Sequence, residues 1–341
     1  MTVDRDTRGF FGALVGNGRP LISFTGLCLI LSGAFALFQS LSKHFLPHDV
    51  AYLGMTPQQL CSINECRIVH FMIHDRISFG GALVAVGVLY LWLAAFPLRH
   101  GERWAWWTLT ASGLVGFGSF LTYLGYGYLD TWHGAATLAL LPCFVAGLVL
   151  SRRLLAPAGV KSPHAAILEP WSTLDFRSPA GLGRVAVLIA AAGMIGGGLT
   201  IQTIGMTYVF VDTDLEFMGL ATEQLAAINP RLVPLIAHDR AGFGGAVATA
   251  GLLTFCCVWF TKPTRSLWQA LFVGGIAGWS TAVFVHPAIG YTDPVHLAPA
   301  VGGASLFFLG LALMIPANFP GASPQDALPA AVKSGEPVVG R

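Results

Sequence analysis

Four histidines occur as two pairs with almost the same spacing. His74 and His133 are 59 residues apart, and His238 and His296 are 58 residues apart. Each lies in a largely apolar stretch, where an ionisable side chain is costly. Imidazole nitrogen binds iron, copper and zinc, and two imidazoles on facing helices can bind one metal centre from both sides. Two pairs at matching positions favour cofactor binding over hydrogen-bonded pairs that only join helices.

The histidines belong to an internal duplication. The motif HDR at 74–76 recurs at 238–240, FLPHDVAYLG at 45–54 corresponds to FVDTDLEFMG at 210–219, and GYLDTWH at 127–133 corresponds to GYTDPVH at 290–296. Apolar residues differ freely between the copies, whereas a few polar residues are kept. The kept pairs are Asp49/Asp214, His74/His238, Asp75/Asp239, Arg76/Arg240, Asp130/Asp293 and His133/His296. Each half is therefore predicted to be one copy of the same helical unit.

One acidic residue precedes the later histidine of each pair. Asp130 stands three residues before His133 and shares its helix face, so we expect its carboxylate to orient the imidazole. Asp293 has the same position before His296.

The earlier histidine of the first half has further polar neighbours. His70 lies one turn before His74 on the same face, and the second half has Pro234 at the corresponding position. Asp75 and Arg76 are turned from His74 by about 100° and 200°, which favours an ion pair or a capping contact near the outer surface.

These residues must be positioned by membrane helices. The chain has 341 residues, of which 54% are hydrophobic and 11% charged, whereas about a quarter of a soluble domain is charged. Apolar blocks of about 20 residues are long enough to cross a bilayer. We predict an all-α membrane protein with eight transmembrane helices in two tandem four-helix bundles. The predicted spans are 21–45, 68–96, 104–125, 131–150, 185–208, 233–260, 267–288 and 294–316.

The distribution of charge predicts the orientation. Lys43, Arg67, Arg76, Arg231 and Arg240 face one side, and the other fourteen of the nineteen basic residues face the opposite side. Basic residues accumulate in the cytoplasm, so both termini are predicted there, in a plasma-membrane protein with the bilayer as its surroundings. The predicted domains are an N-terminal segment (1–20), the first repeat (21–150), a linker (151–184), the second repeat (185–316) and a disordered cytoplasmic tail (317–341). The composition gives no support to nucleic-acid binding.

The first outer loop contains Cys61 and Cys66, and an oxidising compartment would allow them to form a disulfide.

Glycines near the histidines, such as Gly81 and Gly245, leave room for a porphyrin, although small residues also let membrane helices pack closely. The leading hypothesis is one bis-histidine heme b in each half, in an oxidoreductase or electron carrier that uses a quinone or a redox partner protein. A non-heme copper, iron or zinc site and a transporter with two rocking halves are the alternatives.

The paired histidines and the cysteine pair together resemble the heme A synthase family. The resemblance covers most of residues 21–316 and implies two four-helix halves, with heme ligands at His74, His133, His238 and His296. It also implies that the first half is the working site and the second a structural or relay heme. The family's catalytic half has a Glu three residues before its second-helix histidine, followed directly by Arg. This chain has Phe71 at the Glu position, and Asp75 separates His74 from Arg76.

Overall fold

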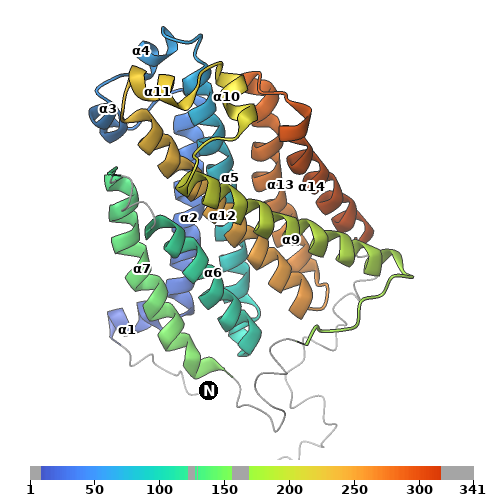
Figure 1. The fold of residues 1–341 in the computed structure, drawn as a ribbon. Coiled ribbons are helices and arrows are strands. Elements are labelled where there is room, and N and C mark those ends of the chain that lie inside the picture. The colour runs from blue at the N-terminus through green and yellow to red at the C-terminus, as the bar shows by residue number, and fades with distance from the viewer. Residues whose placement is uncertain (1–8, 122–126, 129, 156–168, 316–341) are drawn as a thin grey trace, which may run out of the picture.

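The computed structural model describes residues 9–121, 127–128, 130–155 and 169–315. Within these residues the regular structure is entirely helical (Figure 1). Seven helices are long and apolar enough to cross a membrane, as expected for a multi-pass membrane protein. They are α2 (Arg19–Leu41), α5 (Arg67–Ala95), α7 (Thr131–Ser151), α9 (Pro179–Met206), α12 (Leu232–Phe260), α13 (Arg265–Ile289) and α14 (Pro294–Leu313).

These helices coincide with seven predicted spans. The third predicted span is occupied by α6 (Arg103–Leu121), which is not among the seven. The predicted end of that span, residues 122–125, lies outside the described residues, as do 156–168 of the linker and the tail from 316. Short elements α1 (Phe10–Val15), η1 (Leu98–His100) and η3 (Arg152–Leu154) lie next to the long helices.

Side-chain caps define several helix starts. Asp130 accepts the backbone N–H groups of Trp132 and His133 at the start of α7, and Asp293 accepts the N–H of His296 at the start of α14. Such caps satisfy amide groups that have no partner inside the helix. The two caps therefore place His133 and His296, the later histidine of each half, in the first turn of a helix.

The segments that connect the long helices at one end of the molecule are linked across the two halves. They contain α3 (Pro47–Leu53), α4 (Pro57–Cys61), α10 (Asp212–Met218) and α11 (Thr222–Ile228). The Asn64 amide donates to the carbonyl of Met218 at 2.6 Å, and the corresponding Asn229 donates to the carbonyl of Leu53 at 2.7 Å. The predicted disulfide between Cys61, at the end of α4, and Cys66, just before α5, is present.

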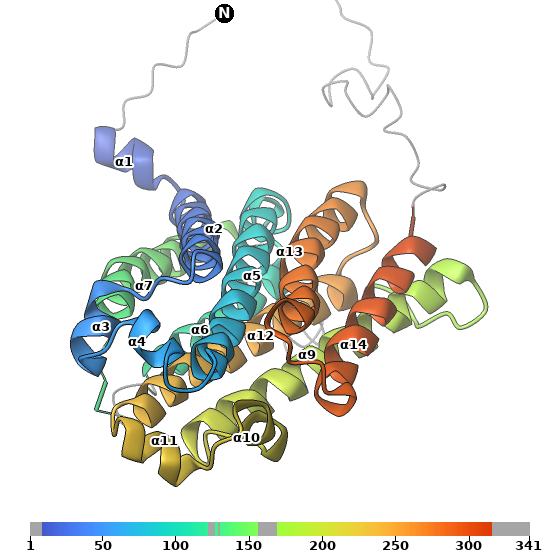
Figure 2. The same cartoon turned by 90° about the horizontal axis from the view of Figure 1, so that it is seen from above.

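The sequence predicted one bundle for each half, but the long helices are not divided in this way. Helices α5 and α12 contact each other at the centre, α13 of the second half packs on α5, and α6 of the first half packs on α12. In Figure 2 α5 lies between α2 and α13. Glycines explain the exchange, because a Cβ at Gly81 would meet Thr281 of α13 and a Cβ at Gly245 would meet Ser119 of α6. Only residues without a side chain let these backbones approach so closely.

Candidate metal centre and its cavity

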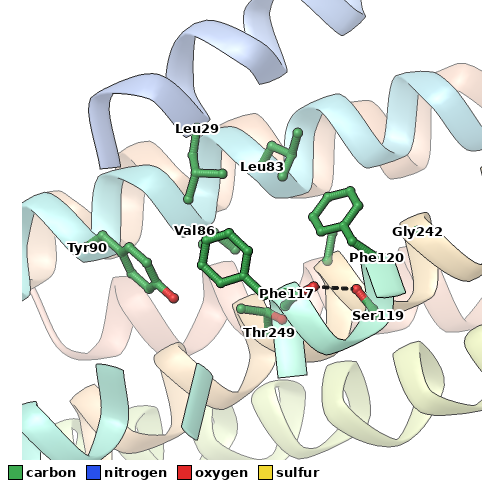
Figure 3. Close-up of a pocket in the computed structure, with 11 residues that line it drawn as sticks. Leu29, Leu83, Val86, Tyr90, Phe117, Ser119, Phe120, Gly242 and Thr249 are labelled. Atoms are coloured by element: carbon green, nitrogen blue, oxygen red, sulfur yellow. Dashed lines mark hydrogen bonds between the residues drawn. The ribbon is translucent and has the colours of Figure 1, made fainter. Parts of the chain in front are cut away.

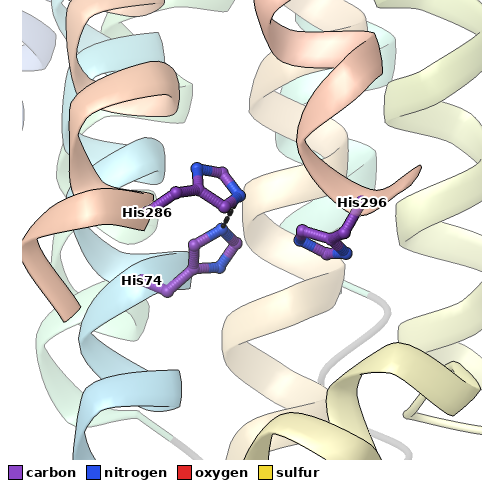
Figure 4. A group of neighbouring side chains, drawn as sticks. All are labelled: His74, His286 and His296. Carbon is purple, nitrogen blue, oxygen red and sulfur yellow. Dashed lines mark hydrogen bonds between the residues drawn. The ribbon is translucent and has the colours of Figure 1, made fainter. Parts of the chain in front are cut away.

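Three imidazoles from three helices converge near one end of the long helices. His74 of α5, His286 of α13 and His296 of α14 each offer one nitrogen, and these atoms lie within 4.8 Å of one another (Figure 4). The Nε2 atoms of His74 and His286 are 3.1 Å apart. The ring centroids are 4.6, 5.6 and 5.2 Å apart in the three pairings.

These distances match a tetrahedral metal site. Imidazole nitrogens about 2.0–2.1 Å from a tetrahedral ion lie about 3.4 Å from one another, which places their rings about 5 Å apart. Axial ligands on opposite faces of a heme iron would have nitrogens about 4 Å apart with the porphyrin between them. The spacing of 3.1 Å between His74 and His286 leaves no room for that plane.

The carboxylate of Asp75 fixes the orientation of His74. Its Oδ1 lies 2.9 Å from Nδ1 of His74, so the imidazole presents Nε2 to the cluster. The other oxygen of Asp75 lies 3.5 Å from Nε of Arg240, and Arg240 also pairs with Asp214. The expected ion pair is present, but the side chain of Asp75 also reaches back to the histidine that it follows. A carboxylate behind a histidine ligand is the usual support of a protein metal site.

The remaining two histidines have different surroundings. The hydroxyl of Tyr291 lies 3.0 Å from Nδ1 of His296 and also donates to Asp214 at 2.9 Å. Burial and the neighbouring Asp214 raise the pKa of Tyr291 well above its usual value, so its hydroxyl stays protonated. His286 is 4% exposed, and the backbone of Ala282 and Val283, one turn earlier on α13, interacts with its ring.

A second cluster lies at the same end of the helices, between the starts of α7 and α12. It combines Asp130, His133 and His238, whose ligand atoms also lie within 4.8 Å of one another. Nδ1 of His133 is 2.9 Å from Asp130 and 3.3 Å from Nε2 of His238. Nδ1 of His238 is 3.2 Å from Asp239. Burial opposes ionisation, but hydrogen bonds from the ring and backbone of His133 hold the pKa of Asp130 well below its usual range.

The structure therefore joins the predicted histidines differently from the sequence hypothesis. His74 meets His296 and His133 meets His238, so each partner comes from the opposite half. The predicted pairing within each half was wrong, because α13 packs on α5 of the opposite half and α6 packs on α12 of the opposite half. Asp130 contacts the imidazole of His133 as expected, whereas the contact that the structure gives Asp293 is the helix cap.

Two other histidines change the ligand set that the sequence indicated. His70 is half-buried and is not among the three converging imidazoles, although it lies one turn before His74. His286 was missed, since the duplication highlighted only residues present in both halves. The sequence offered one indication, because His286 lies at the end of the seventh predicted span, just before the GYTDPVH motif at 290–296.

An apolar cavity of about 890 Å³ extends from the three-histidine cluster. Helices α5, α9, α12, α13 and α14 line it, with small residues such as Gly197, Gly274, Gly278 and Gly303. A second, smaller pocket of about 30 Å³ lies among α2, α5, α6 and α12. Figure 3 shows this pocket, where Phe117, Phe120 and Tyr90 are among the bulky residues that line it.

Comparisons with known proteins do not assign the site. No protein-family model matches the chain, and no match is found among curated proteins or solved structures. The geometry of the histidines and the cavity therefore carries the functional argument.

Proposed function

We propose that this chain is a membrane metalloenzyme in which His74, His286 and His296 bind one transition-metal ion. The observation that carries the proposal is the convergence of three imidazole nitrogens within 4.8 Å. Three imidazoles suit zinc, copper, iron or nickel. Three protein ligands leave a fourth position open, as in catalytic metal sites. Bound metal at this position would supply Lewis acidity, or redox chemistry if the ion is iron or copper.

The surrounding residues have distinct roles in this proposal. Asp75 holds His74 in the tautomer that presents Nε2, and Arg240 pairs with the other carboxylate oxygen of Asp75. Tyr291 fixes the ring of His296 from the side of Asp214. These partners restrict ring rotation, so the three nitrogens converge before any ligand arrives. The second cluster, with one carboxylate and two imidazoles, is a further candidate site of harder donor character.

A bis-histidine heme b is the second candidate, and one observation favours it. The cavity of about 890 Å³ beside His74 and His296 has glycines on three of its helices and could accommodate a porphyrin. Under this alternative His74 and His296 are the axial ligands and His286 is not required. The chain would then be an electron-transfer protein or oxidoreductase similar to heme A synthase.

The proposal includes a membrane orientation. We place α6 across the bilayer as the eighth crossing, since it has the position and apolar character of the third predicted span. An even number of crossings returns both termini to one side. The basic residues of the linker and the loop after α5 make that side cytoplasmic. The clusters would then lie toward the outer face of the plasma membrane.

Metal content and optical absorbance of the purified full chain test the proposal. We expect about one equivalent of metal lost in each of the variants His74→Ala, His286→Ala and His296→Ala, because metal binding requires the complete ligand set. His70→Ala is the matched control on α5 and should keep its metal. Retention of metal in His286→Ala would contradict the three-histidine site. A Soret band that persists in His286→Ala and disappears in His74→Ala would instead establish the heme alternative.

A further inference from the structure

The cavity is long and narrow rather than round. On α5 it is lined by His74, Ser78, Ala82, Ala85 and Leu89. The first and last of these are fifteen residues apart, which corresponds to about 22 Å along the helix axis. A volume of about 890 Å³ is at the upper end of the range for small-molecule sites. Such a space fits an extended chain whose end lies against the histidine cluster.

Helices α9 and α14 form a side opening to this cavity. At the inner end they are in tight contact, since a Cβ at Gly183 would lie 2.5 Å from the carbonyl oxygen of Gly310. Farther along, a Cβ at Gly193, Gly197 or Gly302 would meet no atom within 4 Å. All three glycines are exposed and line the cavity. The two helices therefore diverge over the length of the cavity and leave it open toward the bilayer.

The α10 segment lies across part of the outer end of the opening. The hydroxyl of Thr213 on α10 lies 3.5 Å from Nδ1 of His296 and 3.0 Å from the hydroxyl of Tyr291. The apolar side chains of Ile189 and Val295 line the opening and are 57% and 77% exposed. Access from the bilayer is thus available, while the route from the outer surface is restricted by the α10 segment.

The charges beside the cluster determine which head group fits. Among the described lining residues Arg240 is the only Lys or Arg, and it is already paired with Asp75 and Asp214. Asp212 lines the outer end and is exposed. An anionic head group would find no free cation there and would meet a carboxylate, which disfavours it. An uncharged oxygen-bearing head group avoids both costs.

We infer that the substrate is a lipid with one long apolar chain and an uncharged oxygen-bearing head, which enters from the bilayer between α9 and α14. This inference rests on the proposed function, because the head is placed at the three-histidine cluster. The pocket among α2, α5, α6 and α12 holds only about 30 Å³ and is lined by Phe117 and Phe120, so it does not accommodate such a chain.

Photolabelling of the full chain in phosphatidylcholine vesicles tests the inference. The probe is a long-chain alcohol with a diazirine near the chain end, and labelled residues are mapped by mass spectrometry. Labelling is expected on cavity residues of α5 and α9. Gly197→Phe should lower it by about fivefold or more, because the new ring would fill the cavity. Gly196→Phe is the matched control: Gly196 is exposed, a Cβ there meets no atom within 4 Å, and it does not line the cavity.

Equal labelling in Gly197→Phe and Gly196→Phe would overturn the inference. Equal labelling by the corresponding carboxylic acid probe would overturn the assignment of an uncharged head. A heme that blocks labelling until it is removed would show that the cavity is a cofactor site instead. Metal analysis of the same samples separates the two proposals: metal-free wild-type protein refutes the proposed metal centre, while specific labelling would still establish the lipid cavity.

Discussion

The buried ion pair between Arg76 and Asp239 provides a quantitative test of the exchange between halves. Nε of Arg76 donates to Asp239 at 2.8 Å, and its Nη1 donates to Asp49 at the same distance. Arg76 lies on α5 and Asp239 on α12, and their side chains are 16% and 8% exposed. A unit charge pair at this distance attracts by about 6 kcal/mol at an effective dielectric constant of about 20. Desolvation offsets a large part of that attraction.

A double-mutant cycle of Arg76→Ala and Asp239→Ala should therefore give a coupling energy of about 2–4 kcal/mol. Arg76→Ala alone should be the more damaging single change, since it leaves two buried carboxylates without their cation. The assay is reversible unfolding in mixed detergent, followed by circular dichroism. The exposed pair Glu65–Arg67, 3.4 Å apart, is the control and should couple by less than about 1 kcal/mol. If the Arg76–Asp239 coupling were as small as that of this pair, α5 and α12 would not face each other here.

Further predictions follow from the packing, the outer loop and the ligands. Gly81→Leu should destabilise the protein by about 1–3 kcal/mol or more, because its side chain would overlap α13; thermal unfolding measures this, with Gly134→Leu as the control, because a Cβ at Gly134 meets no atom within 4 Å. Cys61→Ser should lower the unfolding free energy by about 2 kcal/mol in non-reducing buffer, and added reductant should abolish the difference between variant and wild type. Acidification to about pH 3 should release the metal, whereas mild acid should not, since the ligands must be protonated to leave it and burial disfavours the charged imidazole; elemental analysis after desalting would contradict this if the metal were retained at about pH 3. Maleimide labelling of a cysteine introduced at Glu65, in a Cys61/Cys66 double-serine background, should succeed in intact cells, and labelling only after permeabilisation would reverse the proposed orientation.

The positions of the long helices could be predicted from the sequence, because each depends on a local property. An apolar stretch between a cap and a polar loop determines a span, so the predicted ends at 68–96 and 233–260 differ little from α5 and α12. The place of His74 and His238 in the two clusters was also accessible, since an ionisable group kept in both copies stands out against apolar residues that changed. Asp130 was assigned correctly to His133 because the two are three residues apart on one helix.

The choice of partner could not be obtained in the same way. Spacing along the chain gives the depth and face of each histidine, but not which neighbouring helix will face it. That choice depends on contacts such as Gly81 with Thr281, where two surfaces from opposite halves fit closely. His286 shows a second reason, since a comparison of two copies finds only what both copies retain. A residue acquired by one half alone becomes recognisable as a ligand only when its neighbours are known in space.

The exchange of helices has an evolutionary consequence. Each cluster takes residues from both halves, with His74 beside His296 and His133 beside His238. Two separate copies of an ancestral single unit could have formed the same arrangement as a symmetric homodimer with two equal sites. Gene fusion would then have allowed one site to gain His286 and open its cavity while the other became filled. A chain cut within the linker should accordingly regain its metal only when both fragments are made together.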